Sequence, residues 1–204
     1  MSNTQKTNGF ERVKQKKREA IKKSAFSLFT EKGYKEVKIE DIAKKAQVSQ
    51  VTIYNHFGGK DALFRELIKD FTMEEVAFYE VLIKSQLSFK EKMHQMLTRK
   101  LKQSSIFHPE IIEQAMHNDK KLREFLIMYQ NKTIIPIFLS FVRRAQEDGE
   151  INPHLSQEMI LLYINMFNQI GEQQATFLLD MNHEQHTKEL LTMFYYGLSN
   201  PNKV

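Results

Sequence analysis

The sequence predicts an all-α protein, with a small N-terminal head of three helices followed by a larger C-terminal helical bundle. Apolar residues recur at helical spacing along nearly the whole chain rather than alternating with polar ones. The few residues that break helices, 7 glycines and 4 prolines, fall at plausible helix ends. Together these observations predict about nine helices.

The head is expected to form from three helices, at residues 10–32, 39–46 and 50–57. An apolar stripe on the first helix consists of Ile21, Ala25, Leu28 and Phe29. Gly33 then provides the left-handed conformation that commonly ends a helix. Ser49 is a suitable N-cap for the third helix, because its hydroxyl can accept a hydrogen bond from a backbone N–H one turn further on. Ile53 and Phe57, four residues apart, form the predicted buried pair of that helix.

The remaining helices form the predicted bundle. A long fourth helix begins at Lys60 and connects the head with the bundle. Five further helices are expected at residues 88–103, 109–117, 120–148, 156–179 and 184–197. Pro136 should kink or split the helix that contains it at Ile135, because proline lacks the backbone donor that a helix interior needs. The predicted domains are therefore the head at residues 1–59 and the bundle at residues 60–204.

Charge is distributed unevenly along the chain. The whole protein carries a formal charge of +5, whereas residues 1–69 contain 16 basic and 8 acidic residues and so carry +8. The rest of the chain therefore carries −3. A basic head on a mildly acidic body suggests a polyanionic partner for the head, and an ordinary solvated helix face explains the same charges about as well.

Several classes of protein are disfavoured by what the sequence lacks. The absence of cysteine excludes disulfides, thiolate zinc sites and cysteine nucleophiles. His183 and His186 lack the companion ligands of a metal motif, and no nucleophile elbow, phosphate-binding glycine loop or acid–base pair is recognisable. We therefore expect no catalytic residues, metal or cofactor. The N-terminus has no signal-peptide core and the longest apolar run contains Pro136, so a cytoplasmic protein without a membrane partner is expected.

Two short helices joined by a tight turn, at residues 39–46 and 50–57, meet the geometric requirements of a helix-turn-helix. The second helix, about eight residues long, spans roughly 12 Å, about the width of the DNA major groove. Gln50 can bond adenine, Thr52 can bond a base, and Val51 can lie against a thymine methyl group. The side chains expected to contact phosphates are Lys38, Tyr54, Asn55, His56 and Lys60.

The DNA-binding region of the TetR family of bacterial transcriptional regulators closely resembles residues 29–64, FTEKGYKEVKIEDIAKKAQVSQVTIYNHFGGKDALF. The similarity extends back into AIKKSAFSLF. The resemblance implies that Tyr54 and Lys60 contact phosphates, that Gln50, Val51 and Thr52 read bases, and that Ile53 and Phe57 are buried. The family often has glycine in place of Val51, and Thr or Ser in place of Lys38. The operator preference therefore cannot be inferred from relatives.

In this family, the last two long helices form a four-helix bundle with those of a second subunit. The resemblance therefore implies a homodimer. The candidate interface residues on these helices are Leu161, Ile164, Asn168, Gly171, Gln174, Ala175, Leu191, Phe194 and Tyr195. Small residues among them permit close approach of helices. Burial inside one subunit is the alternative explanation for the same residues.

The resemblance also implies a ligand pocket in the body. Methionine and aromatic side chains form adaptable apolar linings. The candidates are Phe78, Met93, Met96, Phe107, Met116, Phe125, Met128, Tyr129, Tyr163 and Phe167. Ordinary core packing explains each of them equally well. Because few charges interrupt these faces, a small apolar or aromatic effector is favoured over an anionic one.

The function predicted from these features is a ligand-responsive transcriptional regulator, most simply a repressor, that binds a palindromic DNA operator as a dimer and is released by the effector. One alternative is a regulator of the same fold that responds to a protein partner or to no ligand. A second is an enzyme or small-molecule carrier that retains a basic head. Steeply salt-dependent binding to its own upstream DNA would exclude the last of these.

Overall fold

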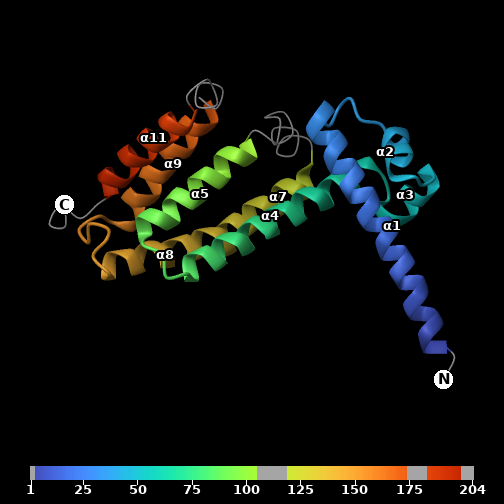
Figure 1. Ribbon diagram of the computed structural model, residues 1–204, viewed down its shortest axis with the longest axis horizontal. Helices are drawn as coiled ribbons and strands as arrows, with labels where there is room; N and C mark the ends of the chain where they lie inside the picture. Colours follow the sequence, from blue (N-terminus) through green and yellow to red (C-terminus); the bar gives the residue numbers. More distant parts are fainter. Residues whose placement is uncertain (1–2, 105–118, 174–182, 199–204) are drawn as a thin grey trace. The chain divides into compact units, whose positions relative to one another are not determined.

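The computed structural model describes residues 3–104, 119–173 and 183–198, and every regular element in these ranges is helical (Figure 1). The elements are α1 (Asn3–Lys32), α2 (Ile39–Ala46), α3 (Gln50–Phe57), α4 (Lys60–Lys84), α5 (Phe89–Ser104), α7 (Lys120–Tyr129), the π-helix η1 (Gln130–Ile134), α8 (Ile135–Glu147), α9 (Gln157–Gln173) and α11 (His183–Leu198). The predicted all-α fold class is confirmed. The helix expected at residues 109–117 lies outside the described residues.

The structure matches most of the predicted helix boundaries closely. Helices α2 and α3 begin and end at the predicted residues, whereas α1 begins at Asn3, earlier than expected. The expected interruption near Pro136 takes the form of η1, in which the Ile135 N–H donates to the Gln130 carbonyl, five residues back. Pro136 then occupies the first turn of α8, so its missing N–H removes no hydrogen bond from the interior of α8.

The chain forms two compact units. The first contains residues 1–74 and 107–126, and the second contains residues 75–106 and 127–204. Helices α4 and α7 each contribute residues to both units. The functional division into a DNA-binding head at residues 1–59 and a sensing body at residues 60–204 remains a prediction.

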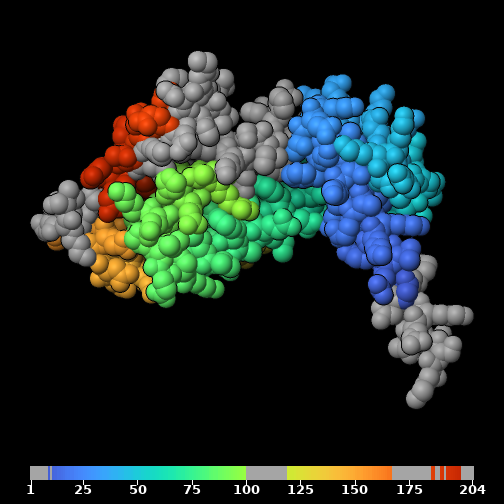
Figure 2. Space-filling view, viewed as in Figure 1, coloured from blue at the N-terminus to red at the C-terminus, as the bar shows by residue number. Residues whose placement is uncertain are grey.

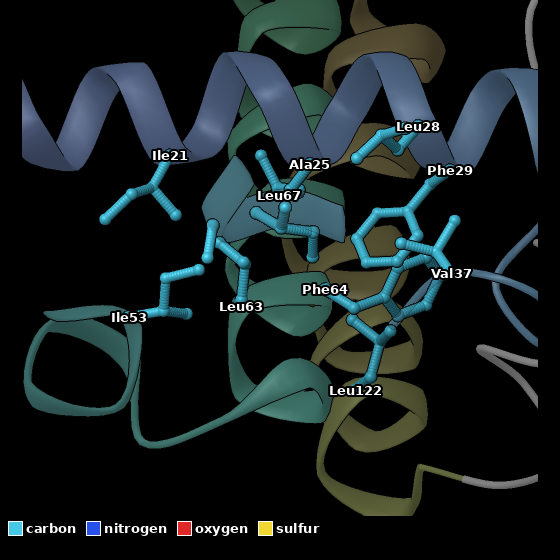
Figure 3. Packing of buried hydrophobic residues seen from close by; sticks show 12 residues of the cluster. Ile21, Ala25, Leu28, Phe29, Val37, Ile53, Leu63, Phe64, Leu67 and Leu122 are labelled. Atoms are coloured by element: carbon cyan, nitrogen blue, oxygen red, sulfur yellow. The ribbon is translucent and has the colours of Figure 1, made fainter. Parts of the chain in front are cut away.

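The core of the first unit holds the three head helices on α4 and the start of α7 (Figure 3). Its buried members are Ile21, Ala25, Leu28, Phe29, Val37, Ile42, Ala43, Ile53, Leu63, Phe64, Leu67 and Leu122. The predicted stripe of α1 lies on the buried side of that helix, as expected from its spacing. Phe29 packs edge to face against Phe64 of α4, with ring centroids 5.3 Å apart. The position of the head helices is therefore set largely by apolar burial.

The core of the second unit is formed by α5, α8, α9 and α11. Its buried members are Phe89, Met93, Phe141, Val142, Ala145, Ile151, Ile160, Phe194 and Leu198. Tyr163 of α9 stacks on Phe194, and its hydroxyl donates to the carbonyls of Met193 and Phe194 at 3.1 and 3.3 Å. A Cβ at Gly197 would collide with the Tyr163 hydroxyl, so this close approach of α9 and α11 requires glycine.

One continuous helical stretch, Lys120–Glu147, is long and apolar enough to cross a membrane by length and composition. The core helices of soluble proteins meet the same two criteria, so this finding is weak evidence for a membrane span. Ile127, Met128 and Ile134 are exposed on this stretch.

Candidate nucleic-acid interface

Helices α2 and α3 are joined by a tight turn whose backbone is closed at both ends by local hydrogen bonds. Gln47 adopts a left-handed conformation (φ 56°), and its N–H donates to carbonyls of the last turn of α2. The Ser49 hydroxyl accepts from the Thr52 N–H at 3.1 Å, which confirms it as the N-cap of α3. These contacts fix the angle between the two helices.

The end of α3 is equally well defined. Gly58 adopts φ 85° and its N–H donates to the Tyr54 carbonyl at 2.8 Å, while Gly59 adopts φ 140°. Both values lie in the region that disfavours residues with a side chain. The consecutive glycines therefore allow α3 to end and α4 to begin at Lys60 without an intervening loop.

Helix α3 has one buried and one exposed face. Ile53 is fully buried, as the family resemblance implies, and Phe57 is partly buried and packs against the same core. Gln50 and Asn55 are exposed, and Val51 and Tyr54 are 65% and 53% exposed. Figure 2 shows α2 and α3, in cyan, on the outer surface of the first unit. The exposed face of α3 is thus a row of polar side chains interrupted by one valine.

Two predicted contact residues are partly engaged inside the protein. The Thr52 hydroxyl lies 2.8 Å from the Ser49 hydroxyl, so this group is shared with the helix cap. His56 is half-buried, and its pKa is lowered by burial and by the nearby charges of Arg18, Lys14 and Lys17. The three cations, rather than the shift itself, give a positive electrostatic potential beside the end of α3.

Lys60 has a structural role that the sequence did not reveal. Its ammonium donates to the Val37 carbonyl at 2.6 Å and, at 3.5 Å, to the Lys35 carbonyl, and it lies 4.3 Å from the centroid of the Tyr34 ring. Burial lowers the pKa of Lys60, opposed by Asp61 and Glu36. Since an ammonium has three donors, one remains for the predicted phosphate contact.

Lys38 is exposed and forms the N-cap of α2. A lysine side chain cannot accept the hydrogen bond that Ser or Thr would accept there. The cap depends instead on the Lys38 N–H, which donates to the Asp41 carboxylate at 2.9 Å. The ammonium of Lys38 is therefore not needed for the cap and is free to contact a phosphate.

Arg18 makes contacts that distinguish it from the neighbouring basic residues, although the sequence alone did not. Its guanidinium donates to the His56 carbonyl at 2.7 Å, forms an ion pair with Glu66, and lies 4.3 Å from the centroid of the Phe57 ring. One side chain of α1 thereby contacts both α3 and α4. Its partners lie 38 and 48 residues away in the sequence, so no local pattern distinguishes Arg18 from its basic neighbours.

The basic residues of the head divide into paired and unpaired groups. Lys22 lies 2.6 Å from Glu66 and 2.7 Å from Asp70; burial alone would lower its pKa, but the two carboxylates outweigh burial and raise it. Lys45 bonds to Ser27 and Glu31. Among the described residues, no ion pair involves Lys14, Lys16, Lys17, Lys38 or Lys44, which are all exposed. These five cations are available to a polyanion.

The structure distributes the ligand-pocket candidates over both units. Phe125 belongs to the core of the first unit, whereas Met93, Met96 and Tyr163 belong to that of the second. Phe78 is half-buried under the Arg99 guanidinium, whose carbon lies 3.9 Å from the ring centroid. Tyr129 is half-buried and Met128 is exposed. Phe107, Met116 and the side chain of Phe167 lie outside the described residues.

The dimer candidates also fall into different environments. Phe194 is buried in the subunit, and Ile164 and Tyr195 pack against the same core. Leu161 is half-buried. Gln174 and Ala175 lie outside the described residues, as do the side-chain environments of Asn168, Gly171 and Leu191. Among the described side chains of α9 and α11, the large apolar ones that are more than half exposed are Met159, Leu162, Met166, Met193 and Tyr196.

A capped pair of short helices, with the second helix exposing polar side chains beside unpaired lysines, defines a helix-turn-helix DNA-binding protein. Residues 21–67 match the family described as bacterial regulatory proteins, tetR family. The head of the chain is therefore a DNA-binding domain of the TetR family, and the chain is a DNA-binding transcriptional regulator.

Relatives with similar sequences are themselves transcriptional regulators. The HTH-type transcriptional repressor KstR2 of Mycolicibacterium smegmatis is 20% identical over 152 residues, which cover 72% of this chain and 74% of the relative. The HTH-type transcriptional regulator UidR of Escherichia coli K12 is 26% identical over 154 residues, which cover 70% of this chain and 72% of the relative.

Solved structures share the fold at low sequence identity. The fatty acid degradation regulator FadR of Bacillus halodurans has a TM-score of 0.68 at 17% identity, over 88% of this chain and 98% of that chain. FadR of Bacillus subtilis in complex with stearoyl-CoA has a TM-score of 0.67 at 18% identity, again over 88% and 98%.

Proposed function

We propose that the protein is a homodimeric repressor that binds a palindromic operator in the cytoplasm and is released from it by a small effector. The observation that carries this proposal is the exposed face of α3, where Gln50, Val51, Tyr54 and Asn55 have no role in the core. In a dimer, one such helix would enter the major groove of each half-site, with the two half-sites about 34–36 Å apart.

Within this interface, we propose that base reading and phosphate contact are separate tasks. Gln50 and Val51 lie at the start of α3, where a helix-turn-helix commonly contacts base edges, and Thr52 presents its methyl group there. Tyr54, Asn55 and His56 follow toward the basic end of α3, where phosphates would be attracted; Lys38 and Lys60 add a cation each. Val51 adds an apolar contact that favours a thymine.

Substitutions on α3 should separate these tasks. Gln50→Ala should cost about 1–3 kcal/mol of operator binding and leave nonspecific binding nearly unchanged, because it removes a base contact. Tyr54→Phe should weaken specific and nonspecific binding alike, because it removes a phosphate contact. Fluorescence anisotropy with the protein's own upstream DNA and a scrambled duplex, over a range of salt concentrations, measures both. An equal loss of discrimination in the two variants would contradict this assignment.

We place the dimer interface on an apolar stripe of α9 and α11 that consists of Met159, Leu162, Met166, Met193 and Tyr196. Each of these side chains is more than half exposed in the single subunit. Exposed large apolar side chains at helical spacing, such as Met159, Leu162 and Met166, are unfavourable in water and are commonly covered by another subunit. The stripe adjoins the predicted interface positions, but it uses the outward side of each helix.

Leu162→Lys should shift the protein from dimer to monomer, because it would place a charge in the centre of the stripe. Light scattering coupled to size-exclusion chromatography measures the mass. Val13→Lys is the matched control, since Val13 is also a half-exposed aliphatic residue on a helix, but in α1. Dimers of equal stability in both variants would place the interface elsewhere.

We propose that a small apolar or aromatic effector releases the protein from its operator. The aromatic and methionine residues that line the second core, such as Met93, Met96 and Tyr163, support it, as does the stearoyl-CoA complex of a neighbour with the same fold. Effector binding in the body would reduce operator affinity by changing the separation of the two heads.

A further inference from the structure

Among the described residues of the second unit, two charged side chains are buried, Glu75 and Lys92, and they differ in how they are neutralised. Glu75 accepts two hydrogen bonds from Nε of Arg99, at 2.9 and 3.0 Å, and one from Nη2, at 2.6 Å. Lys92 of α5 is 8% exposed, yet among the described residues its side chain takes part in no hydrogen bond or ion pair. Its ammonium lies 5.9 Å from the centroid of the Phe141 ring. A buried cation without an anionic partner is energetically costly.

Lys92 lines a recess of about 480 Å³ in the second unit. The recess is bounded by Ser85, Gln86, Leu87, Ser88, Phe89, Glu91, Lys92, Phe141, Arg144, Ala145, Asp148 and Glu150. Phe89 and Phe141 are stacked with centroids 5.0 Å apart and contribute an aromatic wall. The volume is within the range of small-molecule sites in proteins.

The three carboxylates that line this recess already have partners. Glu91 accepts from the Ser88 N–H at 2.8 Å and from its hydroxyl at 2.7 Å. Glu150 accepts from the Phe89 N–H at 2.9 Å, at the start of α5. Asp148 lies 3.9 Å from Nε of the exposed Arg144. Of the charged side chains around the recess, the Lys92 ammonium is therefore the one with neither a hydrogen-bond nor an ion-pair partner among the described residues.

We propose that the recess binds a small organic molecule with a single carboxylate, which pairs with the Lys92 ammonium. The apolar part of the ligand would lie against Leu87, Phe141 and Ala145, and the exposed Gln86 amide is available to a polar substituent. A single negative charge suits the site, because the three carboxylates that line it would repel a polyanion such as a phosphate ester more strongly. The loop Ser85–Ser88 directly follows α4, which contributes residues to both units. A role of this ligand as an effector rests on the proposed function, whereas its binding does not.

Binding is tested on the DNA-free protein with benzoate and hexanoate as probes and their neutral amides, benzamide and hexanamide, as matched controls. Isothermal calorimetry should show affinity for the carboxylates that is about tenfold or more above that for the amides, because a charge-assisted hydrogen bond is lost in the amides. Carboxylates that bind no better than their amides, or that do not bind, would overturn the proposal without reference to DNA.

Variants of two lysines on α5 locate the site. Lys92→Met keeps the length of the apolar side chain but removes the charge, and it should abolish the preference for carboxylates. It should also raise Tm by about 2–4 °C without ligand, since it removes an unpaired buried charge. Lys90→Met removes an exposed charge from the same helix and should change neither property. Retained carboxylate preference in Lys92→Met would exclude the recess as the site.

Discussion

Arg18→Gln is expected to lower both the stability of the head and its discrimination between operator and nonspecific DNA. The variant removes the donor to the His56 carbonyl, one of the end carbonyls of α3 that lacks a helical partner, and the contact with Phe57. Glu66 keeps Lys22 as a partner at 2.6 Å, so the loss should be about 1–3 kcal/mol rather than that of an unpaired buried charge. Thermal and urea denaturation measure it.

The effect on DNA follows because Arg18 fixes the end of α3 that is opposite to its N-cap. We expect the ratio of specific to nonspecific affinity to fall by about tenfold, or about 1.4 kcal/mol. Lys17→Gln is the control, since it removes the same charge from an exposed neighbour. If the two variants lose the same affinity for both DNAs, Arg18 acts only through its charge and does not position α3.

Leu122→Ala should be the most destabilising of the substitutions considered. Leu122 is fully buried in the core that also holds α1, α3 and α4, so truncation leaves a cavity at a cost of about 2–5 kcal/mol. Amide hydrogen exchange should accelerate in α1 to α3, far from residue 122 in the sequence. Unchanged exchange in α1 to α3 would contradict this prediction, because it would mean that Leu122 does not stabilise the head helices.

Ile127→Ala provides the control for Leu122→Ala. Ile127 lies on the same helix and is 47% exposed, so its truncation should change stability by less than about 0.5 kcal/mol. Similar losses in the two variants would mean that Leu122 is not part of the head core. The contrast also tests the anchoring of α7, where Asp119 accepts from the Leu122 N–H at 2.9 Å and pairs with Arg65 at 2.7 Å.

The sequence predicted the parts of this structure that depend on local interactions. Helices α2 and α3, the Ser49 cap and the burial of Ile53 follow from short-range spacing and hydrogen bonding, which a single sequence displays. The break before Pro136 is local for the same reason, because one missing N–H affects only the adjacent turns.

Features that depend on distant residues could not be predicted. The donors of Lys60 reach carbonyls of the loop before α2, and Arg18 reaches Glu66, and neither pairing leaves a periodic signal. The dimer candidates show a second limit: periodicity indicates that α9 has apolar sides, but not which side faces the subunit's own core. Phe194 is on the inner side of α11, whereas Met193 beside it is exposed.

The π-helix η1 has a consequence for how this chain should be compared with other sequences. A π-turn closes over five residues where an α-turn closes over four, so η1 accommodates one residue more than an uninterrupted helix would. A homologue without a proline at position 136 could form a continuous α-helix, and it would then need one residue fewer before α8 to keep Phe141 and Ala145 on the buried side. We therefore expect alignments of homologous chains to contain a single-residue gap between positions 130 and 134.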